Sequence, residues 1–213
     1  TFSPISLFLG MAISGKPVLI EDYAPTWMKE FEHLAQVYTT HLNGLITAIE
    51  HIGSTAVPGL CAKPVIDIDI VIDSRVQLNG IIPILTGLGY EYLGEVAIPD
   101  RFVFRPSSTF VPKDHSGRVW QKHHLYCCLK GSAALRNHLI LRDALKNDEI
   151  LAQEYGALKK RLARASNNMD EYVMGKTKFI TAILATGGMS DRELLAIEQQ
   201  NKSVIPPLSK MSF

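Results

Sequence analysis

The sequence HIGSTAVPGLCAKPVIDIDI, residues 51–70, decides the fold of this chain. An apolar run ends before Gly53 and Ser54, small residues that allow the backbone to turn and to expose its N–H groups. A second apolar run follows as a strand. Because successive side chains of a strand face opposite sides, Asp67 and Asp69 share one face and the isoleucines beside them share the other. The stretch therefore predicts two strands joined by a tight turn, with two carboxylates on one face of the second.

The carboxylate pair predicts a bound cation. Two carboxylates on one face of an apolar strand repel each other and lose solvation. A hard divalent cation such as Mg²⁺ prefers oxygen ligands and would relieve both costs. We therefore expect Asp67 and Asp69 to bind Mg²⁺ as a cofactor and to be catalytic. The alternative is that they lie on a solvated strand face.

A Gly-Ser turn, a spacer from Thr55 to Ile66 and an Asp-x-Asp strand resemble the signature of the nucleotidyltransferase superfamily. In that superfamily the turn holds nucleotide phosphates and the carboxylates hold metal ions. The longer strings HIGSTAVPGL and AKPVIDI resemble the GrpB family, a branch of that superfamily. In some bacteria such a domain is fused behind dephospho-coenzyme A kinase. The resemblance implies an α/β (α+β) fold, with a nucleotidyltransferase-like mixed sheet, flanking helices and a C-terminal helical segment.

Several residues near the carboxylates are candidates for binding phosphate groups. Gly53, Ser54 and Thr55 would cradle phosphates through N–H and hydroxyl donors, unless they form only a plain turn. Lys63 precedes the carboxylate strand and would place a cation beside the ligand, unless it is a solvated loop lysine. Lys176 lies on an otherwise apolar helical stripe, where a lysine is costly unless it contacts an anion or snorkels. We expect an anion contact there.

A later strand carries two arginines on one face. Arg101 and Arg105 alternate with phenylalanines, so both guanidinium groups point to the same side. Arginine binds phosphate oxygens through paired N–H donors, which makes both residues candidates for phosphate contacts. The alternative is an ion pair with Glu91 or Glu95 on a neighbouring strand.

The strand around residues 122–129 carries His124 and Tyr126 on one face. Many superfamily members have a third carboxylate on a strand in this region, whereas this strand has none. GrpB sequences typically have a histidine-rich strand here, which implies His124 as a metal ligand or general base and Tyr126 as a nucleotide contact. A histidine satisfied within the sheet is the alternative for His124. The missing carboxylate argues against two-metal catalysis.

Composition limits the partners. The chain has 213 residues and a formal net charge of +1, which gives no general attraction to nucleic acid or to an acidic membrane. No apolar run reaches the length of a membrane span. Three cysteines, two of them adjacent, do not form a disulfide framework, so we expect buried thiols in a reducing cytoplasm.

The remaining sequence predicts helices around the sheet. Further strands are expected at 90–93, 101–105 and 122–129. Apolar residues at helical spacing predict helices near 25–42, 74–88, 132–145, 151–162, 172–183 and 190–200. We expect a solvated basic face on the fourth of these, formed by Lys159, Lys160, Arg161 and Arg164.

We predict one GrpB-like domain over residues 17–186, with a C-terminal tail at 187–213. Residues 1–16 are expected to be a leader, with residues 1–10 added ahead of a natural start at Met11.

Two functions fit these residues. The first is an enzyme that binds a nucleoside triphosphate with Mg²⁺ and transfers the nucleotidyl group to an unknown acceptor hydroxyl. The second is a non-catalytic module that binds a nucleotide or another small molecule bearing phosphate, linked through the kinase fusion to coenzyme A metabolism. Balanced charge argues against a long nucleic acid as acceptor, and a pure scaffold would need neither carboxylate.

Overall fold

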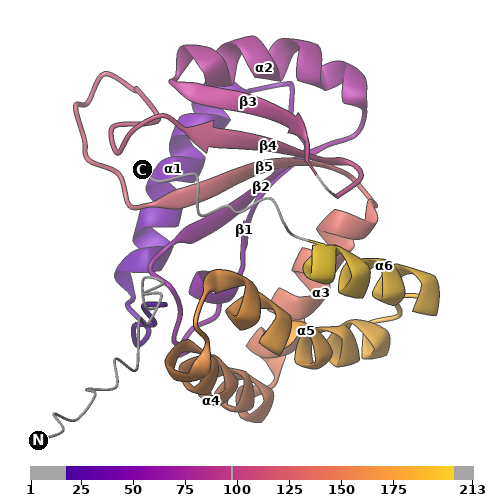
Figure 1. Ribbon diagram of the computed structural model, residues 1–213. Coiled ribbons are helices and arrows are strands. Elements are labelled where there is room, and N and C mark those ends of the chain that lie inside the picture. Colours follow the sequence, from indigo (N-terminus) through magenta and orange to yellow (C-terminus); the bar gives the residue numbers. More distant parts are fainter. Residues whose placement is uncertain (1–17, 97, 204–213) are drawn as a thin grey trace, which may run out of the picture.

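The computed structural model of this chain describes residues 18–96 and 98–203. The expected leader at 1–16 and the last ten residues of the expected tail lie outside these ranges. The described residues contain one β-sheet and six α-helices (Figure 1).

A mixed five-stranded sheet forms the centre of the fold. Its strands are β1 (Ala48–Ile52), β2 (Ile66–Ile72), β3 (Tyr90–Glu95), β4 (Arg101–Pro106) and β5 (His123–Leu129). Their order in the sheet is β1-β2-β5-β4-β3, and only β2 and β5 are parallel neighbours. The predicted α/β class with a mixed sheet is confirmed. Outside these strands, Glu21 and Ala62 form an isolated β-bridge.

Six helices surround the sheet. They are α1 (Thr26–His41), α2 (Leu78–Gly87), α3 (Ala133–Asn147), α4 (Glu149–Ala165), α5 (Met169–Thr186) and α6 (Asp191–Ser203). In Figure 1, α1 and α2 lie with the sheet in the upper part of the molecule, and α3 to α6 gather below it. The predicted C-terminal helical segment is thus confirmed, including the amphipathic helix near 190–200.

The alternation in β2 determines which face each side chain occupies. Ile66, Ile68 and Ile70 are fully buried in the core formed with α1 and α2. Asp67 and Asp69 therefore face the opposite side, where α3 packs a smaller apolar cluster against the sheet. The parallel pairing of β2 with β5 places Asp67 opposite His124 and Asp69 opposite Tyr126. The two aspartates of β2 and the His124 and Tyr126 side chains of β5 therefore lie next to one another on one face of the sheet.

One prediction about α4 is wrong. Lys159, expected on a solvated face, is only 2% exposed. Its ammonium group donates a hydrogen bond to the Cys61 carbonyl oxygen and lies 4.9 Å from the centroid of the Tyr155 ring. The helical pattern grouped Lys159 with the exposed Lys160, Arg161 and Arg164. In the fold, the loop before β2 covers the part of α4 that carries Lys159. Burial lowers the pKa of Lys159 to about 7, since the charged form loses solvation.

The buried Lys159 predicts a specific dependence of stability on pH. Its pKa rises from about 7 in the folded chain to the ordinary lysine value of 10.5 on unfolding, so between these pH values the unfolded state binds more protons. The free energy of unfolding should therefore rise with pH across this window, by a few kcal/mol from this group. Denaturant unfolding at several pH values should show that Lys159→Met removes this group's contribution to the rise, whereas Lys160→Met, at the exposed neighbour, retains it. Equal pH profiles for the two variants would contradict the prediction.

No helix among the described residues is long and apolar enough to cross a membrane. All three cysteines are free and buried, as expected.

Candidate functional site

The turn after β1 brings backbone directly beside the first carboxylate. Gly53 has φ of +69°, a left-handed conformation that L side chains rarely adopt. A Cβ atom built on Gly53 would collide with the carboxylate of Asp67. A short 3-10 turn, Ser54–Ala56, follows it. Glycine is therefore required here both for the turn and for the close approach to Asp67.

The two carboxylates are each held by an imidazole. His124 Nδ1 donates to Asp67 Oδ1 over 2.8 Å, and His138 Nδ1 donates to Asp69 Oδ2 over 2.7 Å. The Asp67 side chain is 30% exposed, whereas that of Asp69 is 0% exposed. Asp69 Oδ1 is buried and has no hydrogen-bond partner among the described residues. Because an unpaired buried carboxylate oxygen is costly, this atom is suited to a cation.

Asp67 is ionised in this environment. Burial acts to raise its pKa, but the hydrogen bond from His124 and the electrostatic effect of His124, His138 and Lys63 together lower it below its ordinary value. The donor set therefore consists of one ionised, partly exposed carboxylate and one buried carboxylate two residues further along the strand. This pair fits a hard divalent cation.

No carboxylate on β5 completes the set. The residues of β5 opposite Asp67 and Asp69 are His124 and Tyr126. On the other side of β2, Glu50 lies opposite Asp69, but it pairs with Arg142 over 2.6 Å. The position on β5 beside Asp67 is thus occupied by an imidazole that already donates a hydrogen bond to this carboxylate.

Lys63 and Lys176, which lie far apart in the sequence, both interact electrostatically with Asp67. Burial lowers the pKa of Lys63, against the attraction of Asp67. Burial and the charge of Lys63 lower the pKa of Lys176 to about 8, again against the attraction of Asp67. The Lys176 ammonium lies 4.4 Å from the centroid of the Tyr172 ring. Lys176 is thus attracted by the Asp67 carboxylate and repelled by Lys63. A bound anion would reduce the repulsion between the two ammonium groups.

The two arginines of β4 have different partners. Arg105 forms an ion pair with Glu91, its neighbour on β3. The guanidinium of Arg101 lies 4.7 Å from the centroid of the Tyr126 ring, and its Nε is buried without a hydrogen-bond partner among the described residues. The alternative of an ion pair therefore applies to Arg105. Arg101 and Tyr126 form a stacked pair beside the carboxylate face.

The hydroxyl groups of the turn are not equivalent. Thr55 is buried, donates to the Val65 carbonyl oxygen over 3.3 Å and lies 3.0 Å from His51 Nε2. Burial lowers the pKa of His51 to about 4, so its ring is neutral at pH 7. Thr55 thus joins the turn to the start of β2, while Ser54 is half-buried. Of the two, Ser54 is the better placed to meet a ligand.

Sequence reasoning missed His138. It lies on α3, on a helical stripe with the apolar residues Ala134 and Leu141, and reaches Asp69 from a distance of 69 positions along the chain. Its only signal in the sequence is a polar residue on an inward-facing stripe. The pairing with Asp69 depends on how α3 crosses the sheet, which no local pattern indicates.

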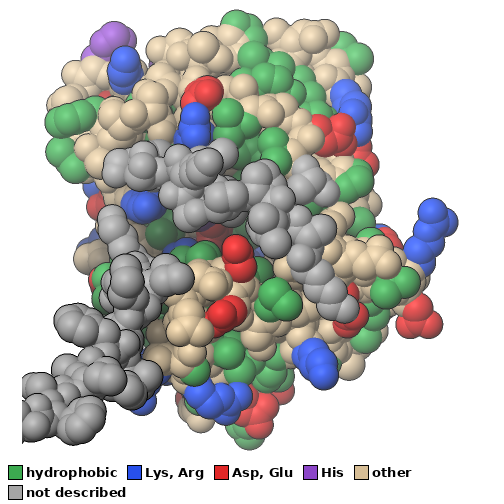
Figure 2. Space-filling model, viewed as in Figure 1, with side chains coloured by type: hydrophobic (Ala, Val, Ile, Leu, Met, Phe, Trp, Pro, Cys, Tyr) green, Lys and Arg blue, Asp and Glu red, His purple; other side chains and the backbone are tan. Residues whose placement is uncertain are grey.

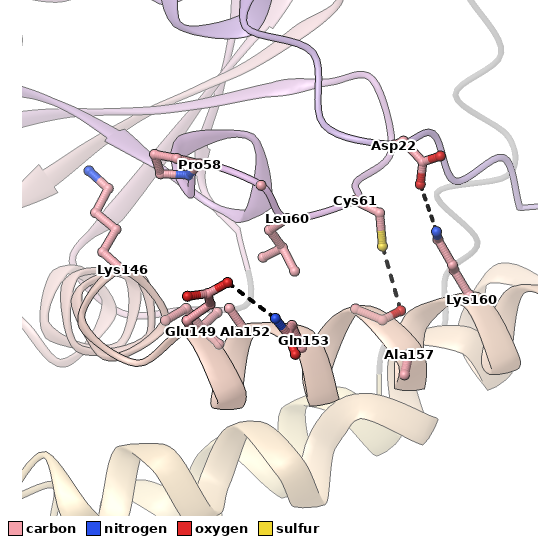
Figure 3. A pocket seen from close by; sticks show the side chains of 13 residues that line it. Asp22, Pro58, Leu60, Cys61, Lys146, Glu149, Ala152, Gln153, Ala157 and Lys160 are labelled. Carbon is pink, nitrogen blue, oxygen red and sulfur yellow. Dashed lines mark hydrogen bonds and ion pairs between the residues drawn. The ribbon is translucent and has the colours of Figure 1, made fainter.

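The carboxylate face is distinct from a large pocket elsewhere. In the space-filling view, basic and acidic side chains border a recess between the sheet and the C-terminal helices (Figure 2). A pocket of about 800 Å³ lies between residues 58–61, the C-terminal end of α3 and one face of α4. Figure 3 shows the Asp22–Lys160 ion pair and the Glu149–Gln153 hydrogen bond at its edges. None of the predicted site residues lines this pocket.

The fold and site together define a mixed α/β domain with an Asp-x-Asp strand placed directly beside a Gly-Ser turn. The chain belongs to the GrpB family, since the family model described as "GrpB protein" matches residues 17–186.

Known relatives agree with this assignment. The crystal structure of conserved protein GrpB from Enterococcus faecalis is similar with a TM-score of 0.64 and 30% identity, over 85% of this chain and 98% of that chain. UPF0157 protein YqkA of Bacillus subtilis is 32% identical over 75% of this chain and 43% of its own length. A dephospho-CoA kinase of Mycolicibacterium paratuberculosis is 27% identical over 77% of this chain and 44% of its own length. The chain thus spans less than half of the last two relatives.

Proposed function

We propose that this chain binds a nucleoside triphosphate with Mg²⁺ at Asp67 and Asp69 and transfers the nucleotidyl group to an acceptor hydroxyl. The observation that carries the proposal is the unpartnered, buried Asp69 Oδ1 on the same strand face as Asp67, which lies against the Gly53 turn. These residues resemble the Gly-Ser turn and the Asp-x-Asp strand that bind phosphates and metal ions in the nucleotidyltransferase superfamily.

The chain's own residues supply the binding groups. Ser54 and the N–H groups of the turn would donate to phosphate oxygens, and Lys63 and Lys176 would balance their charge. Arg101 and Tyr126 offer a cation and a ring beside the carboxylates for the rest of the nucleotide. When bound, Mg²⁺ would neutralise the triphosphate and favour ionisation of the attacking hydroxyl.

His124 is the proposed general base. Asp67 orients the imidazole through Nδ1, which leaves Nε2 to accept the hydroxyl proton. The hydroxyl oxygen forms a bond to the α-phosphorus as the bond to pyrophosphate breaks, so pyrophosphate carries away the leaving electron pair. The balanced charge of the chain favours a small acceptor over a long nucleic acid, and its buried free thiols fit a reducing cytoplasm.

A second candidate is nucleotide or phosphate binding without transfer. It is favoured by the absence of a carboxylate on β5 and by the imidazoles that already donate hydrogen bonds to both aspartates. The similarity to a relative named dephospho-CoA kinase supports a link of such a module to coenzyme A metabolism.

Calorimetric titration of ATP, GTP, CTP and UTP, each with and without Mg²⁺, tests both candidates. We expect Mg²⁺-dependent binding of at least one nucleotide. Pyrophosphate release across a screen of acceptor hydroxyl compounds then distinguishes them, because only transfer releases pyrophosphate. Absence of binding in every condition would contradict nucleotide binding in both candidates, and binding without release would contradict transfer.

A further inference from the structure

A second cluster of potential metal ligands lies on the same sheet face, further along β2 than Asp67. Asp69, Cys128 and His138 each offer one ligand atom, and these atoms all lie within 4.8 Å of one another. The three residues come from β2, β5 and α3, so only the folded chain assembles them. The cluster differs from the Asp67–Asp69 pair in its chemistry, because it combines oxygen, sulfur and nitrogen donors.

The position of Cys128 separates this cluster from Asp67. Cys128 lies opposite Val71 in the parallel pairing of β2 with β5, whereas Asp67 lies two residues before Asp69 in the other direction. The thiol and Asp67 therefore flank Asp69 on opposite sides along the strand. Asp69 has one oxygen engaged by His138, and its other oxygen, Oδ1, has no hydrogen-bond partner among the described residues.

The cluster is largely closed to solvent, with Arg101 opposite Cys128 on β4 and Tyr126 opposite Asp69 on β5 as its polar neighbours. Cys128 packs with Val71 and Leu135, and Ala48 and Leu139 lie against them. Asp69 and Cys128 are fully buried, whereas the His138 side chain is 19% exposed and gives the cluster its contact with solvent. Such a shell excludes water from the buried ligands and leaves one open side, as in metal sites with a free coordination position.

From this geometry we infer that Asp69, Cys128 and His138 form a binding site for Zn²⁺, separate from the proposed Mg²⁺–nucleotide site except for the shared Asp69. Zinc is a borderline-soft ion that accepts thiolate, imidazole and carboxylate ligands together, whereas Mg²⁺ prefers oxygen alone. With an ionised Asp69, a Cys128 thiolate and a neutral His138, the charge of Zn²⁺ is balanced, which limits the cost of burying it.

Binding requires only small changes in the cluster. His138 Nδ1 would exchange its hydrogen bond to Asp69 Oδ2 for a bond to the ion, and the released Oδ2 would become a zinc ligand, which leaves Oδ1 to the proposed Mg²⁺ site. The proton of His138 then resides on Nε2, and the Cys128 thiol proton is released to solvent. The fourth position of a tetrahedral site would be filled by water on the side of His138.

Cobalt substitution tests the site, because Co²⁺ takes zinc positions and a cobalt–thiolate bond absorbs in the near ultraviolet. Metal-free protein, kept reduced with a phosphine, is titrated with Co²⁺ and then with Zn²⁺. We expect the charge-transfer band to saturate at one equivalent of Co²⁺ and to disappear when Zn²⁺ displaces it. A wild-type protein without this band would overturn the inference regardless of any variant.

Two cysteine variants locate the ligand. Cys128→Ser should abolish the band and weaken Zn²⁺ binding at least about 100-fold. Cys127→Ser is the matched control, since Cys127 is equally buried but packs into the core on the opposite face of the sheet, and it should retain the band. A band that persists in Cys128→Ser, or that only Cys127→Ser removes, would overturn the inference. If Cys128→Ser does not fold, His138→Gln, at a half-buried position, should likewise lose tight Zn²⁺ binding.

Asp67→Asn separates this inference from the proposed function. It should retain the cobalt band while losing Mg²⁺-dependent nucleotide binding. A band present in a protein that binds no nucleotide would support the zinc site and contradict the proposed function, and the reverse result would contradict the zinc site alone.

Discussion

Asp67→Asn should lose Mg²⁺-dependent nucleotide binding while the domain stays folded. The amide keeps the volume of the carboxylate and can still accept a hydrogen bond from His124, but it removes the negative charge that the cation needs. Substitution of residues that only support a metal ligand typically costs 10–100-fold in affinity, so loss of the ligand itself should cost at least about 100-fold. Calorimetric titration with Mg²⁺ and the preferred nucleotide measures the effect.

Asp73→Asn is the matched control for this substitution. Asp73 follows β2 directly and is exposed, and it accepts a hydrogen bond from Thr47 over 2.9 Å. The substitution Asp73→Asn removes one negative charge next to β2, as Asp67→Asn does, but at a position that does not contact the Gly53 turn. Nucleotide binding should therefore be unchanged in Asp73→Asn. Equal affinities for the two variants would show that the charge of Asp67 has no special role in binding.

Gly53→Ala should damage both stability and binding. A side chain at φ of +69° and ψ of −172°, a backbone region essentially restricted to glycine, costs about 1–3 kcal/mol of conformational strain. In addition, the new Cβ would displace the Asp67 carboxylate, which has no free space on this side. We expect a lower free energy of unfolding by denaturant titration and at least about a 10-fold loss of Mg²⁺-dependent nucleotide affinity, since ligand groups must be held within about 0.5 Å of their productive positions.

Gly44→Ala separates strain from displacement. Gly44 has a similar φ of +76°, but no heavy atom lies within 4 Å of a Cβ built there. It should lose about 1–2 kcal/mol of stability and retain full nucleotide binding. If Gly53→Ala binds nucleotide as tightly as Gly44→Ala, the close approach of the turn to Asp67 has no functional consequence.

The sequence predicted the central part of the site because that part is local. Gly53 and Asp67 lie within one turn and the strand that follows it, and an alternating strand pattern fixes which side chains share a face. The same reasoning gave His124 and Tyr126 a common face on β5. That Asp67 lies opposite His124 depends on parallel pairing between strands that are more than fifty residues apart, and the sequence alone did not give this register.

Local patterns failed where burial depends on a distant segment. Lys159 belongs to a run of basic residues that reads as a solvated helix face, yet the loop at Cys61 covers it. Arg101 and Arg105 are equivalent in the strand pattern, but only Arg105 has an acidic residue opposite it on β3. In both cases a residue from another segment, Cys61 for Lys159 and Glu91 for Arg105, determines the environment of the basic side chain.

The sequence by itself determined the turn, the carboxylate strand, the α/β class and the family, because these follow from backbone geometry, side-chain alternation and a continuous motif. Only the tertiary structure decided that His138 holds Asp69, that Cys128 lies beside them and that Lys159 is buried. The physical reason is that hydrogen bonds, ion pairs and desolvation act over a few ångströms in space, and the packing of α3 and α4 sets which distant residues come within that range.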